Sequence, residues 1–122
     1  MTVLGNRFSS RPAETLAALN RSLAMIEFDT QGTVLTANEN FCSALGYRLP
    51  EIVGQHHSLF VEPIDRQSPD YREFWPRLAR GEFGTGEYLR IGKGGAEVWI
   101  QASYNPVRTS AGKVTRVVKV AS

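Results

Sequence analysis

Cysteine, histidine and long apolar runs are all scarce in this chain of 122 residues. The single cysteine, Cys42, cannot form an internal disulfide, which is typical of proteins from a reducing compartment. The two histidines, His56 and His57, are adjacent and too few for a structural zinc site. No apolar run approaches the ~20 residues that span a bilayer, and the N-terminus lacks the apolar segment of a signal peptide. We therefore expect a cytoplasmic location and no membrane insertion.

An excess of charge of one sign is also missing. The net charge is only +2 and the basic residues are scattered, so the sequence predicts no nucleic-acid surface. The chain shows no nucleophile–base pair, no paired acids on a rigid element and no phosphate-binding loop. The turn Gly92–Gly95 is followed by neither Ser/Thr nor a helix, which distinguishes it from a P-loop. We expect no enzymatic activity.

Apolar runs bounded by glycine-containing turns predict five strands. The segment Gly86–Gln101 predicts two strands around a tight Gly-rich turn, and Val114–Val120 predicts a third strand after another turn. These three strands form an antiparallel meander. Earlier in the chain, Ala24–Phe28 and Thr33–Ala37 predict a hairpin around Gly32.

Short helices are predicted between the two groups of strands. Asn38 is the expected N-cap of a helix over Glu39–Leu45, and a single helical turn is expected over Leu49–Gly54. A longer helix is indicated by the aromatic and apolar residues from Tyr71 to Leu78, with a kink or break caused by Pro76. The order of elements predicts an α+β fold, in which a five-stranded antiparallel sheet carries the short helices on one face.

The N-terminal region is expected to form a separate cap. Residues 1–11 are polar and mixed, and we expect them to be loose. Pro12–Leu23 predicts an amphipathic helix, because leucines recur at spacings of three and four. The expected division is therefore a cap helix within residues 1–22 and a sensor-like domain over residues 23–122.

Several short motifs are each weak signals of a protein family, and they become a specific signal only when they are taken together and in order. They are Thr36-Ala37-Asn38 with Phe41, Leu45-Gly46-Tyr47, Glu51-Ile52-Val53-Gly54, Phe74-Trp75 with Leu78 and Gly81-Glu82, Arg90–Gly95, and Val98–Val107. Jointly they resemble the PAS sensor family over about residues 23–122, and most of all the PAS domains of cytoplasmic and aerotaxis-type chemotaxis receptors. The resemblance implies a PAS fold, a signal-sensing role and a downstream chemoreceptor signalling domain.

The resemblance also implies a pocket between the sheet and the short helices. Strand alternation places Ile100, Ala102 and Tyr104 on one face, and family precedent puts that face inside. The small side chain of Ala102 either leaves room for a ligand or accommodates a large neighbour such as Trp75.

The opposite face of the sheet is expected to form an interface. Trp99 points away from the pocket, and Val118 and Val120 of the last strand share its face. A stripe on the N-terminal helix is available to cover this face: Leu16, Leu19 and Leu23. We expect a homodimer in which the helices pack against both sheets. The alternative is a monomer whose own helix covers the sheet.

FAD is the cofactor that the resemblance favours. It carries His57 and Trp75 onto matching positions of the aerotaxis-receptor pattern, and Arg90 and Asn40 are expected near polar flavin or phosphate groups. Haem is the alternative cofactor, with His56 or His57 as its axial metal ligand. A domain without a cofactor that serves only for dimerisation is the remaining alternative.

Overall fold

One antiparallel sheet organises the computed structural model, which describes the backbone of residues 2–122 and the side chains from Arg11 onward. Its five strands are β1 (Ala24–Phe28), β2 (Val34–Ala37), β3 (Gly84–Ile91), β4 (Glu97–Arg108) and β5 (Val114–Ala121). Their order across the sheet is β2-β1-β5-β4-β3. The last strand therefore lies beside the first, at the centre of the sheet. The predicted α+β fold with a five-stranded antiparallel sheet is confirmed.

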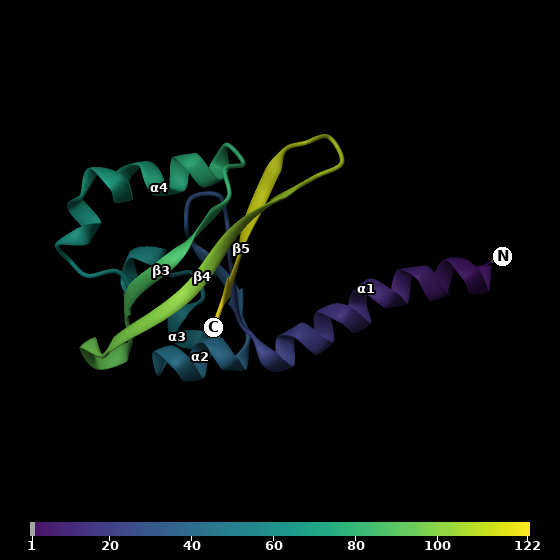
Figure 1. Ribbon diagram of the computed structural model, residues 1–122, viewed down its shortest axis with the longest axis horizontal. Coiled ribbons are helices and arrows are strands. Elements are labelled where there is room, and N and C mark those ends of the chain that lie inside the picture. Colours follow the sequence, from purple (N-terminus) through teal and green to yellow (C-terminus); the bar gives the residue numbers. More distant parts are fainter. Residues whose placement is uncertain (1) are drawn as a thin grey trace.

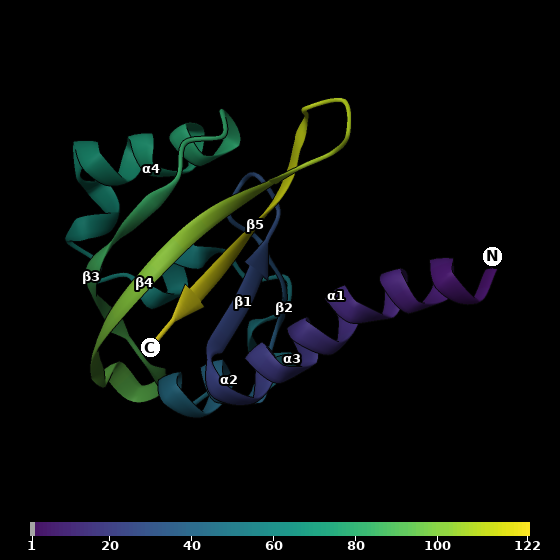
Figure 2. The same ribbon diagram turned by 45° about the vertical axis from the view of Figure 1, so that its right-hand side comes forward.

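The helices lie mainly between the second and third strands in sequence. They are α1 (Thr2–Ser22), α2 (Glu39–Leu45), α3 (Leu49–Ile52) and α4 (Pro69–Ala79), with single 3-10 turns η1 (His57–Phe60), η2 (Asp65–Gln67) and η3 (Lys93–Gly95). The helices α2, α3 and α4 lie on one side of the sheet, whereas α1 runs away from it (Figures 1 and 2). The sheet face that lacks these helices is left open.

Local sequence signals account for the short helices. The Asn38 side chain accepts a hydrogen bond from the Phe41 amide at 3.0 Å, and Gly46 ends α2 with φ +77°. The predicted break at Pro76 is wrong, because α4 continues through it to Ala79. Pro76 and Arg72 are both exposed, so water can bond the Arg72 carbonyl that the proline cannot serve.

The N-terminal helix is longer than the sequence predicts. It begins at Thr2 instead of Pro12, so most of the segment expected to be loose is helical. Pro12 lies inside this helix. Only the last turn of α1 lies next to the sheet. The rest of the helix extends away from the body of the domain and does not fold back over the sheet (Figure 2).

The core fills the space between the sheet and the helices α2 and α4. Alternation along β4 is as predicted: Ile100, Ala102 and Tyr104 are buried, whereas Trp99 is 67% exposed. The main cluster of buried apolar side chains consists of Ile26, Phe28, Val34, Phe41, Leu45, Ile52, Phe60, Trp75, Leu78, Tyr104 and Val117. Aromatic rings dominate it, so the interior is packed with few flexible side chains.

The hairpin between β1 and β2 depends on Gly32. Its φ is +92°, and a Cβ atom added there would lie 2.7 Å from Cε2 of Trp75 and 2.8 Å from Nε2 of His56. The turn therefore needs glycine both for its left-handed backbone and for its closeness to α4.

We predict that Gly32→Ala destabilises the domain more than Gly112→Ala. Both positions have φ near +90°, so each alanine costs about 1–2 kcal/mol of backbone strain. At Gly32 the collision with Trp75 adds about 1–3 kcal/mol, whereas a Cβ at Gly112 meets no atom within 4 Å. Urea unfolding of both variants measures the difference. Equal losses would show that the turn can move away from α4.

Candidate functional site

A hydrogen-bonded group of polar side chains lies inside the aromatic core. Nδ1 of His57 lies 2.8 Å from the Tyr71 hydroxyl, and Nε2 lies 3.0 Å from the Tyr104 hydroxyl. Arg90 donates from Nη2 to the same Tyr104 hydroxyl at 3.0 Å. Together with Trp75 and Lys119, these residues are called the interior cluster below. It brings together η1, α4, β3, β4 and β5.

The hydrogen bonds around Tyr104 indicate one arrangement of protons. Arginine can only donate, so the Tyr104 oxygen accepts from Arg90 and its hydrogen is free to bond Nε2 of His57. Nδ1 of His57 then carries the proton and donates to Tyr71. This assignment, inferred from the bonding pattern, gives both nitrogens of His57 a partner and leaves His57 neutral.

Two cationic side chains in the cluster are buried without an acidic partner. Arg90 is 8% exposed and Lys119 is 1% exposed. No carboxylate of the described residues lies within 4 Å of either one. Instead, Arg90 Cζ lies 4.7 Å from the Tyr88 ring centroid, and Lys119 Nζ lies 4.9 Å from that of Tyr104. Ring faces offset part of the cost of burying these charges.

The cluster shifts the pKa values of its own members. Burial, followed by the nearby Arg90 charge, lowers the pKa of Lys119 well below its usual value. Burial also lowers the pKa of His57, and the charges of Lys119 and Arg90 act in the same direction. Burial raises the pKa of Tyr104 to about 12, so its hydroxyl is neutral at physiological pH. The cluster therefore contains two basic side chains and no internal anion; burial favours the neutral form of Lys119, whereas an anion beside it would favour the charged form.

Four of the seven predicted cofactor contacts meet in this cluster: His57, Trp75, Arg90 and Tyr104. The other three lie elsewhere. Ile100 and Ala102 pack with Ala121 in a separate small cluster of the sheet, not against Trp75. Asn40 lies outside the interior, where its amide donates to backbone carbonyls at the end of α1, among them that of Leu23 at 3.1 Å. A contact of Asn40 with a flavin stays a prediction, and in this structure the Asn40 amide already donates to the backbone.

Tyr71 and Lys119 are the members of the cluster that the sequence analysis did not identify as site residues, and Lys119 is the less expected of the two. It pairs with Tyr104 in the register of β4 and β5 and with Ile26 in the register of β1 and β5. Lys119 alternates with Val117 and Ala121 along β5, and all three side chains are buried on the same face. This alternation could have indicated from the sequence that Lys119 points inward. A lysine at an inward position of a central strand is rare enough to mark a polar site.

The residues present do not fit a haem group. Nε2 of His56 lies 2.8 Å from the Gln31 carbonyl, and Nδ1 accepts from the Ser58 amide at 3.1 Å. Both nitrogens of His57 are also used, so neither histidine offers a free nitrogen to iron. No group of three or more possible metal-binding side chains occurs in the described part of the chain.

A cleft between α4 and β3 leads toward the interior cluster. It has a volume of about 390 Å³. Its lining residues are Phe74, Arg77, Leu78, Glu82, Phe83, Gly84, Thr85 and Tyr88. Tyr88 also contacts Arg90 and the Tyr104 ring, the latter with 5.5 Å between centroids. Tyr88 thus separates the cleft from the buried cations.

The cleft and the cluster together fit a flavin ring better than a haem. Phe74 and Tyr88 supply ring faces, and Nε of Arg90 is buried with no hydrogen-bond partner among the described residues. A flavin ring needs aromatic surroundings and donors for its polar edge. The residues that would hold it are Phe74, Tyr88 and Arg90.

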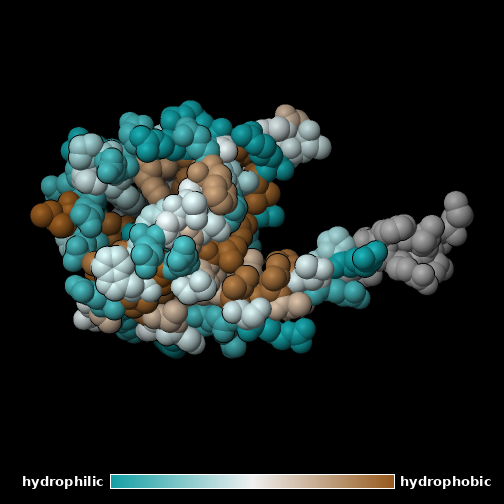
Figure 3. Space-filling model, in the orientation of Figure 1, coloured by the Kyte–Doolittle hydropathy of each residue, from teal (hydrophilic) through white to brown (hydrophobic). Residues whose placement is uncertain are grey.

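The face of the sheet opposite the helices is partly apolar and open. Trp99 is 67% exposed on it, and Val118 and Val120 are half-buried farther along the sheet, opposite Asn105 and Ser103 of β4. On α1, Leu16 is 50% and Leu19 is 43% exposed, and Figure 3 shows apolar side chains where α1 leaves the body. The helix of the same chain therefore does not cover this face.

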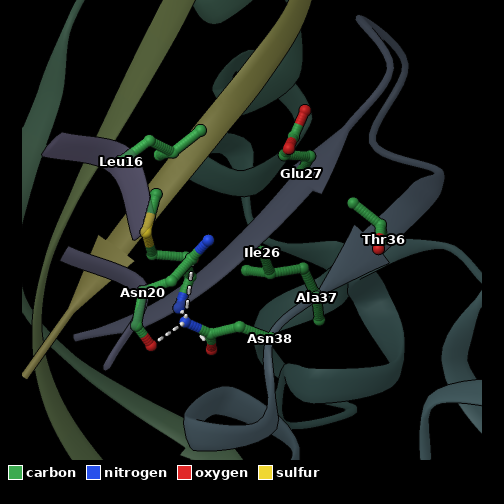
Figure 4. Close-up of a pocket in the computed structure, with 8 residues that line it drawn as sticks. Leu16, Asn20, Ile26, Glu27, Thr36, Ala37 and Asn38 are labelled. Atoms are coloured by element: carbon green, nitrogen blue, oxygen red, sulfur yellow. Dashed lines mark hydrogen bonds between the residues drawn. The ribbon is translucent and has the colours of Figure 1, made fainter. Parts of the chain in front are cut away.

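The joint between α1 and the sheet contains a small cavity. Its volume is about 140 Å³, and Leu16, Ile26 and Asn38 are among the side chains around it (Figure 4). The Asn38 side chain accepts from the Met25 amide at 3.0 Å and donates to the Leu23 carbonyl at 2.7 Å. This asparagine connects the end of α1 to β1.

None of the helices described for residues 2–122 is long and apolar enough to cross a membrane.

Comparison with known proteins assigns the fold to a family. The family model described as "PAS fold" matches residues 34–121, so the chain belongs to the PAS family. It is 50% identical over 107 residues to the biofilm dispersion protein BdlA of Pseudomonas aeruginosa, covering 88% of this chain and 26% of that protein. It is 28% identical over 92 residues to the aerotaxis receptor of Escherichia coli, covering 75% of this chain and 18% of that receptor.

Solved structures support the same fold. One is described as a flavin-analogue study of a light-oxygen-voltage domain, with a TM-score of 0.74 and 22% identity; it covers 90% of this chain and 83% of that one. Another is a PAS domain from Colwellia psychrerythraea, with a TM-score of 0.76 and 19% identity, covering 90% and 93% of the two chains. The resemblance to PAS domains that the sequence motifs indicated is confirmed.

We predict that the stability contributed by Lys119 depends on pH. The unfolded chain keeps the lysine protonated up to about pH 10.4, whereas burial makes the folded chain release the proton at lower pH. Raising the pH from about 7.5 to about 9.5 should therefore stabilise the wild type relative to Lys119→Met, by up to ~1.4 kcal/mol per pH unit.

Urea unfolding of both proteins across this range measures the difference. The exposed Lys113→Met is the matched control, and its difference from the wild type should stay constant. A constant difference for Lys119→Met as well would contradict the burial of an uncompensated amine.

Proposed function

We propose that this PAS domain is the signal-input module of a chemotaxis-type receptor in the cytoplasm. It binds a small ligand or cofactor between α4 and the sheet, and it relays the bound state through a homodimer to a downstream signalling domain. The single observation that carries the proposal is the polar interior cluster beside the cleft. A domain that served only as a scaffold would gain stability from an apolar core in its place.

Flavin adenine dinucleotide is the favoured cofactor. The relative named as an aerotaxis receptor and the neighbour described by a flavin analogue support this choice. In this chain, Phe74 and Tyr88 would border the ring and Arg90 would donate to its polar edge. A bound flavin would make the module sensitive to oxygen or redox state. The role is sensory, with no reaction on a substrate.

The central strands offer a route from the interior to α1. Lys119 on β5 pairs with Ile26 on β1, so a change of charge beside Lys119 acts on β1 directly. β1 begins two residues after α1 ends, and Asn38 bonds to both sides of this joint. A ligand that favours one arrangement of β1 and β5 therefore shifts the position of α1.

The homodimer is supported by the open sheet face and by the direction of α1. The helix leaves the body, so its leucines and the sheet face with Trp99 both lack a cover within the chain. A second copy supplies both partners at once: its α1 covers this sheet, and this α1 covers its sheet. Such an exchange satisfies two-fold symmetry.

We predict that the purified domain carries flavin absorption bands near ~450 and ~370 nm. Absorption between about 300 and 650 nm measures this directly. A strong band near ~400–430 nm would instead indicate haem and would contradict the geometry of both histidines. A featureless spectrum would remove FAD from the proposal and leave a colourless ligand.

We predict that Trp99→Glu converts the dimer into a monomer. A carboxylate on the open face, at the position of the exposed Trp99, cannot be buried in an interface without a large cost. Light scattering should show the mass fall from that of two chains to that of one. Ile64→Glu is the matched control, because Ile64 is 79% exposed and lies away from the sheet, between η1 and η2. A dimer that survives Trp99→Glu would exclude this face as the interface.

A further inference from the structure

The buried cations of the interior cluster are not explained by the packing of the domain alone. Arg90 and Lys119 are both more than nine-tenths buried, and neither faces a carboxylate among the described residues. Removing a charged group from water is costly unless it is paired. Cation–π contacts with Tyr88 and Tyr104 offset only part of that cost.

The surrounding hydroxyls cannot supply the missing negative charge. Tyr104 is the nearest hydroxyl to Arg90, and its pKa of about 12 keeps it neutral. Its oxygen accepts from Arg90, and its hydrogen is used by His57. Tyr71 is engaged with the other side of the same imidazole. Among the described residues, Arg90 and the Lys119 amine are therefore surrounded by neutral partners only.

Arg90 also has hydrogen-bonding capacity left over. Nη1 donates to the Leu89 carbonyl at 3.1 Å and Nη2 donates to Tyr104, but Nε has no partner among the described residues. A buried guanidinium with an unused donor is prepared for an acceptor that the described residues do not supply. A carboxylate is a suitable acceptor, because its oxygens accept from arginine in a fixed geometry.

The cleft between α4 and β3 supplies the route to this donor. Tyr88 lines the cleft on one side and contacts the guanidinium of Arg90 on the other. Tyr88 lies near the middle of β3 and is only half-buried. Rotation of this single side chain would open the cleft toward Arg90.

We propose that the ligand of this domain carries an anionic oxygen group that binds between Arg90 and Lys119, behind Tyr88. This inference rests on the proposed sensing function and names the chemistry of its ligand. The anionic group belongs either to a free carboxylate of small size or to a flavin cofactor. Binding neutralises the interior, and Lys119 passes the change to β1 through its pairing with Ile26.

Thermal unfolding of the purified domain tests the proposal. The probes are acetate, succinate, citrate and FAD, each compared with sodium chloride at equal ionic strength. At least one probe should raise the melting temperature of the wild type. Its apparent affinity should fall at least tenfold in Arg90→Gln and in Lys119→Met. The exposed Lys113→Met should bind as the wild type does.

The variants also separate a ligand site from a structural role. Without a probe, Lys119→Met should unfold at the same or a higher temperature than the wild type, because it removes an uncompensated charge. A lower melting temperature together with unchanged probe binding would overturn the proposal. Arg90→Lys keeps the charge but loses the planar donors, so it should bind more tightly than Arg90→Gln and less tightly than the wild type.

The result for FAD identifies the source of the anion. Stabilisation by FAD alone assigns the anionic group to the cofactor, and stabilisation by a carboxylate assigns it to a free ligand. Flavin that is retained equally by wild type, Arg90→Gln and Lys119→Met would overturn this inference and leave the proposed function intact. The absence of any effect from all four probes would overturn the inference whatever the dimer measurement shows.

Discussion

The hydroxyl of Tyr104 is the point on which the interior of this PAS domain depends. It bonds His57 from η1 and Arg90 from β3, while its ring lies beneath Lys119 of β5. His57 extends the connection to Tyr71 of α4. One fully buried oxygen thus connects the helical layer to the sheet. Of its two partners, Arg90 donates a hydrogen bond and His57 accepts one. Because the oxygen accepts from arginine, its own hydrogen is available to donate to histidine, whereas Nε of Arg90 is left without a partner among the described residues.

The same arrangement explains why the fold can transmit a signal. A core of apolar side chains alone would respond little to a bound molecule, because packing contacts are insensitive to charge. Buried basic groups without counter-charges respond strongly, because an entering anion lowers the free-energy cost of burying their charges and raises their proton affinity. The central position of β5 between β1 and β4 brings that response next to the strand that follows α1.

Sequence patterns determined the elements and their faces but not the contents of the interior. Strand alternation correctly placed Tyr104 inside and Trp99 outside, because the period of two in a strand leaves no other choice. The family resemblance directed attention to His57, Trp75 and Arg90, which the structure does bring together. It did not indicate that Asn40 lies at the surface, where its amide donates to backbone carbonyls at the C-terminal end of α1.

The sequence by itself thus decided the strand order along the chain, the turns at glycine and the inward and outward positions. Only the tertiary structure decided that Lys119 lies against Tyr104, that no carboxylate of the described residues pairs with it, and that α1 leaves the sheet uncovered. The physical reason is the separation along the sequence of the residues in contact. Periodicity and turn chemistry act over a few residues. The interior cluster joins residues 57 and 104, and the central pairing joins β1 to β5, and only the folded chain creates these contacts.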